Sequence, residues 1–283
     1  MPGLEGGRRS KGRRRIPPGE AVRSTLIALV STAFVLAVIV VVVTNAPNWP
    51  EVQQAFFNGE IFARALPDIV QAFVVNIQLF LAAEVLVLAL GLILAILRGL
   101  PGPLFFPVRL LATVYVDFFR AVPGLLIIYL LGFGIPGLGI EGVPNSPFLY
   151  AVLGLTLVYS AYVSEVYRAG IDSVHWSQEA AARSLGLSRP QALRYVVVPQ
   201  AVRRVIPPLL NDFIGLQKDT VLVSVIGVVE IFREAQIIKS ATFNFTPFLA
   251  VALVFVVITI PLARFTDWLV DRDRARQAAM AFR

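Results

Sequence analysis

The sequence predicts an all-α membrane protein with about six transmembrane helices. Apolar residues make up 57% of its 283 residues, and its mean hydropathy is +0.75. A soluble domain of this length could not bury so much apolar surface. Long apolar runs recur along the chain, and basic residues gather in the segments between them. These observations indicate that lipid is the solvent for most of the chain.

The apolar runs place the spans in order. The first, 25–43, follows a basic segment, so a cleaved signal peptide is the alternative reading. Its 19 residues exceed the usual signal core and no small-residue cleavage site follows, so we expect a retained helix. The second run, 69–97, is interrupted only by Glu84. The remaining spans are expected over 110–131, over 148–163, from Pro207-Pro208 to 229, and over 247–263.

The basic residues indicate how the chain is oriented. Twenty Lys and Arg fall on the side of the amino terminus, and only three (Arg64, Arg233 and Lys239) fall on the other. The positive-inside rule therefore places both termini in the cytoplasm, with the charge facing anionic lipid rather than nucleic acid. The expected organisation is a basic cytoplasmic tail over 1–23, an extra first span and outer loop over 24–66, a transmembrane core over 67–268 with a cytoplasmic loop over 172–205, and a charged cytoplasmic tail over 269–283.

Several kinds of chemistry are disfavoured by residue usage. The sequence has no cysteine and a single histidine, His175, so neither thiol catalysis nor a metal site is expected. It contains no nucleophile–base pair, which disfavours a membrane enzyme with catalytic residues. It also lacks a Gly-x-x-x-x-Gly-Lys-Ser/Thr phosphate loop, so this chain is not expected to bind or hydrolyse ATP.

The long cytoplasmic loop reads as a folded unit. Ser177 is a candidate cap for a helix over 177–185, and Gly186 suits the left-handed position that ends it. A second helix is expected from Ser188 and Pro190 to 198, stopping before Pro199. The run of small alanine side chains in the first helix would let another surface approach closely. A helical hairpin lying on the membrane is the alternative.

Residues 173–188 read SVHWSQEAAARSLGLS, and residues 196–199 read VVVP. This pattern resembles the cytoplasmic signature loop of binding-protein-dependent ABC importer permeases, which is Glu-Ala-Ala, three residues, Gly, nine residues, then Ile-x-Leu-Pro. Gly186 and Pro199 keep the spacing, with valines in place of the isoleucine and leucine. In this register Ala180 occupies the position of the signature glutamate, and Glu179 lies one position earlier.

Flanking segments resemble the polar amino-acid branch of the same family. Residues 115–123 read YVDFFRAVP, and matching residues continue through 160–171 and 199–220, so the resemblance covers about 71–267. It implies the type I importer permease (MetI-like) architecture in a bacterial cytoplasmic membrane. It also implies a cytoplasmic ATPase dimer carrying ATP and Mg²⁺, an extracytoplasmic solute-binding protein and a second permease subunit, either a copy or a paralogue. The substrate class implied is glutamate and glutamine, or the basic amino acids.

The resemblance assigns contact with the ATPase to the loop. Gly186 is the expected pivot between its two helices, and the coupling residues are Ser177, Gln178, Glu179, Ala180, Ala181, Ala182, Leu185, Gly186 and Pro199.

Charges and polar groups inside the spans are costly and should face a partner or water. Asp117 and Arg120 are three residues apart and can form a structural ion pair on one helical face; ligand contact is the alternative. Glu84 could pair with another span or face the pore. The candidate substrate path comprises Asn211, Gly215 and Lys218, which share a helical face, together with Asp219 and Glu84.

An ion-coupled secondary amino-acid transporter acting without an ATPase is the main rival function. Its coupling residues would be the intramembrane acidic and basic groups. The sequence shows no inverted repeat of broken helices, and a docking loop would have no purpose in a solitary carrier. A permease driven by a separate ATPase is therefore favoured.

Overall fold

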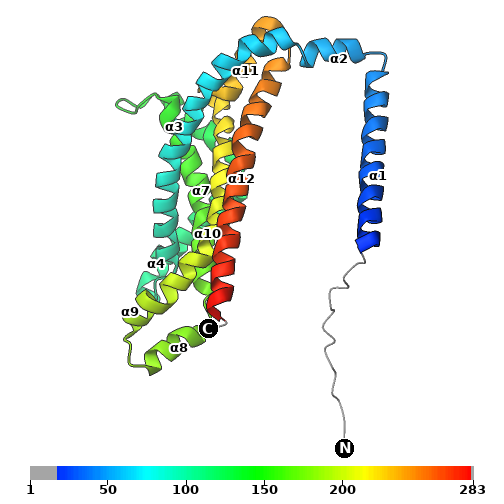
Figure 1. The fold of residues 1–283 in the computed structure, drawn as a ribbon. Coiled ribbons are helices and arrows are strands. Elements are labelled where there is room, and N and C mark those ends of the chain that lie inside the picture. The colour runs from blue at the N-terminus through cyan, green and yellow to red at the C-terminus, as the bar shows by residue number, and fades with distance from the viewer. Residues whose placement is uncertain (1–17, 282–283) are drawn as a thin grey trace, which may run out of the picture. The chain divides into compact units, whose positions relative to one another are not determined.

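The computed structural model describes the backbone of residues 18–281 and the side chains of residues 23–272, and throughout that part of the chain the regular elements are helical (Figure 1). Most of the basic tail predicted over 1–23 lies outside the described residues. Contacts divide the chain into one unit over 1–54 and a second over 55–283. The first unit contains α1 (Pro18–Thr44), whose described side chains are all exposed, as expected for a helix solvated by lipid.

Length and composition identify four helices in the described residues that could cross a bilayer, or five if one bent pair is a single span. Besides α1 these are α3 (Gly59–Arg98, preceded by the short α2, Trp49–Phe56), α7 (Pro147–Asp172) and α12 (Thr246–Ala281). They confirm the predicted spans near 25–43, 69–97, 148–163 and 247–263, although each helix extends further. In particular, α12 remains helical through most of the tail predicted over 269–283.

The third predicted span is broken rather than straight. After η1 (Pro103–Phe105), α4 (Phe106–Ala121) is followed at a bend of 103° by α5 (Gly124–Tyr129), the π-helix η2 (Leu130–Gly134) and the single turn α6 (Ile135–Gly137). Val122 is extended, with φ −87° and ψ 132°, because the following Pro123 disfavours helical backbone at the preceding residue. The span predicted over 110–131 is therefore interrupted by a sharp bend at Val122 and Pro123.

The fifth predicted span corresponds to α10 (Val198–Asp219), which begins well before Pro207. Helical backbone runs without interruption from α9 (Arg189–Ala192) through the π-helix η3 (Leu193–Val197) into α10, so the predicted stop before Pro199 is wrong. Pro199 is the second residue of α10, just after the π-helical turn of η3. Because α10 is amphipathic, it is not among the helices that composition alone identifies as spans. It nevertheless packs against the spanning helix α7.

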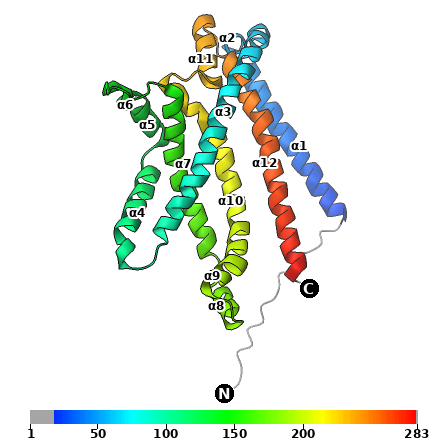
Figure 2. The same ribbon diagram turned by 90° about the vertical axis from the view of Figure 1, so that its left-hand side faces the viewer.

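In the second unit, α3, α7 and α10 lie side by side and surround the main apolar core (Figure 2). The loop helices α8 (Trp176–Ser184) and α9 lie at one end of this bundle, called the loop end below. At the opposite end, α11 (Ile231–Thr242) packs on α3 and α12, after the 3-10 helix η4 (Thr220–Ile226). The fold thus carries one folded polar appendage at the loop end.

A buried amide ties three elements together at the end opposite the loop. The Asn76 side-chain amide of α3 donates to the Thr220 hydroxyl and to the Glu230 carboxylate, each at 3.0 Å. Its oxygen accepts from the backbone N–H of Ile231 at 3.1 Å. All four residues are fully or almost fully buried, so these bonds fix η4 and α11 against α3 in a medium where unmade bonds are costly.

Gly132→Ala should destabilise the bundle, whereas Gly134→Ala in the same π-helix should not. A Cβ at Gly132 would lie 2.4 Å from the Ile226 side chain, while one at Gly134 would meet nothing within 4 Å. Overpacking of this kind costs about 1–3 kcal/mol. Thermal unfolding in one detergent should therefore show a lower midpoint for Gly132→Ala alone; equal midpoints for both variants would contradict the packing seen here.

Candidate functional site

The first loop helix, α8, confirms the predicted helix over 177–185 to within one residue at either end. Its cap is His175 rather than Ser177: the backbone N–H of Ser177 donates to the His175 ring nitrogen Nδ1 at 3.3 Å. His175 therefore has a local structural role as the cap of α8, whereas the sequence indicated only a polar loop residue. The sequence rules favoured Ser177 because a histidine is an uncommon cap.

Gly186 ends α8 in the left-handed conformation that the sequence predicts, with φ +89°. Its N–H donates to the carbonyl of Arg183 at 3.0 Å, and that of Leu187 donates to the carbonyl of Ala182 at 3.3 Å. These two bonds form a Schellman motif, which satisfies carbonyls that the end of a helix would leave free. The turn between the loop helices therefore depends on a residue without a Cβ.

The second half of the loop begins with a capping box. The backbone N–H of Ser188 donates to the Gln191 side chain at 2.8 Å, and Gln191 in turn is capped by the Ser188 side chain. Across the turn, Glu179 lies 3.5 Å from the guanidinium of Arg189. Glu179 is thus engaged inside the loop in the structure, while Ala180 at the signature position is exposed.

The two loop helices form a folded unit, called the loop tip below, with exposed apolar side chains at both ends of α8. Ala182 and Ala192 are buried, and α8 packs against η3. In contrast, Trp176 is 74% exposed and Leu185 is 83% exposed. A hollow of about 600 Å³ lies between the helices, lined by residues that include Ala180, Arg183, Gly186 and Gln191. Exposed apolar side chains beside a hollow are typical of a surface that another protein covers.

The loop is attached to the bundle at its root. The Arg204 guanidinium of α10 donates to the carbonyl of Ser173, which caps the end of α7. A Cβ at Gly170 would lie 2.0 Å from the Val205 side chain, so the two helices approach as closely as glycine allows. These two contacts hold the base of the loop against α7 and α10.

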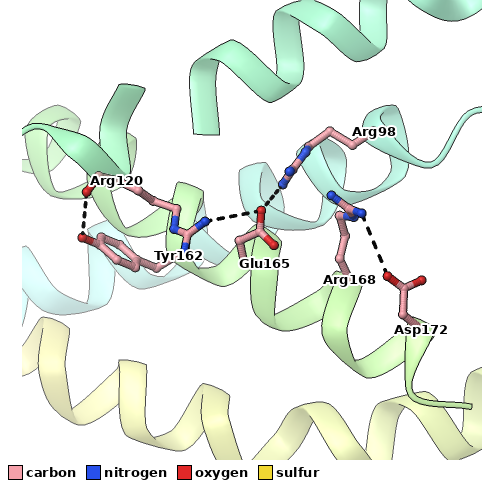
Figure 3. A network of polar contacts seen from close by, with 6 residues as sticks. All are labelled: Arg98, Arg120, Tyr162, Glu165, Arg168 and Asp172. Atoms are coloured by element: carbon pink, nitrogen blue, oxygen red, sulfur yellow. Dashed lines mark hydrogen bonds and ion pairs between the residues drawn. The ribbon is translucent and has the colours of Figure 1, made fainter. Parts of the chain in front are cut away.

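Close to the loop end, one carboxylate joins three helices (Figure 3). Glu165 of α7 accepts a hydrogen bond from Arg98 at the end of α3 and lies 3.6 Å from Arg120 at the end of α4. The Arg98 side chain is only 8% exposed, whereas that of Glu165 is 32% exposed, so the guanidinium is the more deeply buried member of the pair. Arg120 also lies over the Tyr162 ring, 6.0 Å from its centroid. Arg168 and Asp172 form a separate, more exposed pair at 4.0 Å.

The predicted ion pair between Asp117 and Arg120 does not form among the described residues. Arg120 turns toward Glu165 instead, and Asp117 is exposed. The three-residue spacing along α4 would allow Asp117 and Arg120 to pair. The Glu165 carboxylate of α7 lies near the same guanidinium and takes the place of Asp117. Because Glu165 is far from Arg120 in sequence, spacing alone could not identify it.

The candidate substrate-path residues do not all face one space. Asn211 lines a cavity of about 370 Å³ shared with the loop end of α12, Lys218 is exposed, and a Cβ at Gly215 would lie 3.3 Å from the Tyr159 hydroxyl. That hydroxyl donates to Asp219 at 2.7 Å.

Glu84 of α3 and Asp212 of α10 are both half-buried carboxylates. Asp212 was not singled out from the sequence, and neither was Tyr159. Asp212 adjoins Asn211 in sequence but lies on another face of the helix.

Comparison with known proteins identifies the family. The model of the family described as "Binding-protein-dependent transport system inner membrane component" matches residues 88–274. The chain is 36% identical over 202 residues to the probable amino-acid permease protein YxeN of Bacillus subtilis, covering 71% of this chain and 89% of YxeN. It is 38% identical over 207 residues to the glutamate transport system permease protein GluC of Corynebacterium efficiens, covering 69% and 90%.

Solved structures agree. A crystal structure of an amino acid ABC transporter with histidines matches with a TM-score of 0.68 at 32% identity, covering 74% of this chain and 96% of that one. The inward-facing MetNI methionine ABC transporter matches in fold, with a TM-score of 0.56 at 16% identity, covering 72% and 95%. The chain therefore belongs to the binding-protein-dependent transport inner membrane components, the permease subunits of ABC importers.

Proposed function

We propose that this chain is one of two permease subunits of an ATP-driven importer of a polar amino acid. The second subunit is a copy of this chain or a paralogue. Loop 172–205 and both termini lie in the cytoplasm of a bacterial cell, and a solute-binding protein delivers the amino acid at the opposite face. The names of the relatives support the substrate class, since they include glutamate and other amino-acid permeases.

The folded loop supports the proposal that this chain is driven by a separate ATPase. It presents Trp176 and Leu185 outward from a rigid base, and Arg204 links that base to the end of α7. An ATPase dimer docked on this tip would move α7 and α10, and through Glu165 also α3 and α4. ATP and Mg²⁺ are bound by that dimer and not by this chain.

The candidate path residues Asn211, Gly215, Lys218, Asp219 and Glu84 remain part of the proposal. Lys218 is exposed in the single chain, which suits a group that faces a space shared with the second subunit. Glu84 on α3 and Asp219 on α10 are half-buried, and Asp219 accepts a hydrogen bond from Tyr159 of α7.

Uptake into sealed proteoliposomes tests the proposed function. The permease is reconstituted with its ATPase and binding protein, and accumulation of labelled L-glutamine, L-glutamate, L-arginine and L-lysine is followed with and without internal ATP. One or more of these should accumulate only when both ATP and the ATPase are present. Accumulation driven by an ion gradient in liposomes lacking the ATPase would instead establish the solitary carrier.

A further inference from the structure

A cavity of about 520 Å³ opens between α3 and the start of α11, at the end opposite the loop. Its volume is within the range of roughly 300–1,000 Å³ that small-molecule sites occupy. Asp68, Gln71 and Gln78 line it from α3, and Glu234 lines it from α11. Its apolar wall includes Val75 and Val229.

The polar groups occupy one face of α3. At 100° per residue, Asp68, Gln71, Val75 and Gln78 fall within an arc of about 80°. Gln71 and Gln78 are exposed in the single chain, although they lie in an otherwise apolar run. Amides facing hydrocarbon would be costly, so this face of α3 is built to meet water or a polar solute.

The lining of the cavity is acidic. Among the described residues it contains two carboxylates, Asp68 and Glu234, and no basic residue. The three basic residues expected on this side are engaged elsewhere. Arg64 pairs with Glu60 at 2.5 Å, Arg233 donates to Gln236 at 3.0 Å, and Lys239 lies 5.2 Å from the centre of the Phe245 ring.

We infer that this cavity receives the transported amino acid on its way from the binding protein and selects for a positive net charge. This inference rests on the proposed function and makes it more specific: a basic amino acid carries two cationic ends, which match two carboxylates contributed by different helices. The two amides can accept or donate to the carboxylate and side chain of the solute. Glutamate, with a net negative charge, would be repelled by the same lining.

The test compares three forms of the permease in proteoliposomes containing the ATPase and the binding protein. The first is the wild type, the second is Asp68→Asn/Glu234→Gln, and the third is Glu51→Gln/Glu141→Gln. The third also removes two exposed carboxylates from the side predicted to be outer, but neither of these lines the cavity. Initial ATP-dependent uptake is measured for L-arginine, L-lysine, L-glutamine and L-glutamate.

We expect wild-type uptake of L-arginine or L-lysine, a loss of about tenfold in the cavity variant and little change in the control pair. A charge-conserving variant, Asp68→Glu/Glu234→Asp, should retain more uptake than the neutral one, which separates a charge effect from misfolding. ATP-dependent uptake of L-glutamine or L-glutamate without either basic amino acid would overturn the inference and leave the proposed function standing. Equal uptake of a basic amino acid by the wild type and the cavity variant would also overturn the inference. If uptake of all four amino acids were independent of ATP, both the inference and the proposed function would be overturned.

Discussion

Gly186→Val is expected to uncouple ATP hydrolysis from uptake while the protein still inserts into the membrane. Gly186 adopts φ +89°, and no atom lies within 4 Å of a Cβ built there, so the cost comes from the backbone and not from crowding. A left-handed residue with a side chain costs about 1–2 kcal/mol, and more when it is β-branched. Loss of the Schellman turn would misorient α8, so amino-acid uptake should fall about tenfold at comparable ATPase activity.

Gly186→Asn is the matched control, because asparagine tolerates the left-handed conformation far better than valine. It should retain most of the uptake per ATP hydrolysed. The measurement is the ratio of labelled amino acid accumulated to phosphate released in the same proteoliposomes. If the valine variant keeps the wild-type ratio, the turn at Gly186 is not needed for coupling.

Glu165→Gln should destabilise the bundle more than any other single removal of a charge discussed here. Its carboxylate serves both Arg98 and Arg120, and Arg98 is only 8% exposed (Figure 3). Leaving a buried guanidinium without its carboxylate costs about 3–5 kcal/mol. We therefore expect a clearly lower unfolding midpoint in detergent, together with loss of uptake.

Asp172→Asn provides the comparison within the same helix. Asp172 pairs with Arg168 at 4.0 Å, and the two side chains are 71% and 36% exposed. A pair of this kind contributes about 0–1 kcal/mol, so its removal should leave the midpoint almost unchanged. Similar midpoints for the Asp172 and Glu165 variants would show that Glu165 does not hold α3, α4 and α7 together.

The local signals in the sequence predicted the loop well. Gly186 alone fixed the end of α8, because few residues other than glycine adopt φ near +89°. The apolar runs likewise located α1, α3, α7 and α12, since a helix needs about 20 apolar residues to cross a bilayer whatever it packs against.

Prolines and long-range partners limited the prediction. Pro199 reads as a helix stop, yet a π-helix leads into it and the chain stays helical. Pro123 reads as part of a span, yet the helix breaks there. Arg120 has Asp117 within reach on its own helix but lies near Glu165 of α7. The course of the helix at each proline and the partner of Arg120 depend on packing between helices. The spacing of residues along one helix carries no information about that packing.

Site-specific cross-linking from the loop tip tests the central claim most directly. The natural chain has no cysteine, so single cysteines can be introduced without background. Leu185→Cys is compared with Leu104→Cys; these leucines are 83% and 82% exposed, and Leu104 lies in a turn predicted on the same side of the membrane. In the assembled complex, a short thiol-reactive cross-linker should join position 185 to the ATPase subunit and leave position 104 unlinked. Cross-linking from position 104 alone, or from neither position in a complex that transports, would contradict docking of the ATPase on α8.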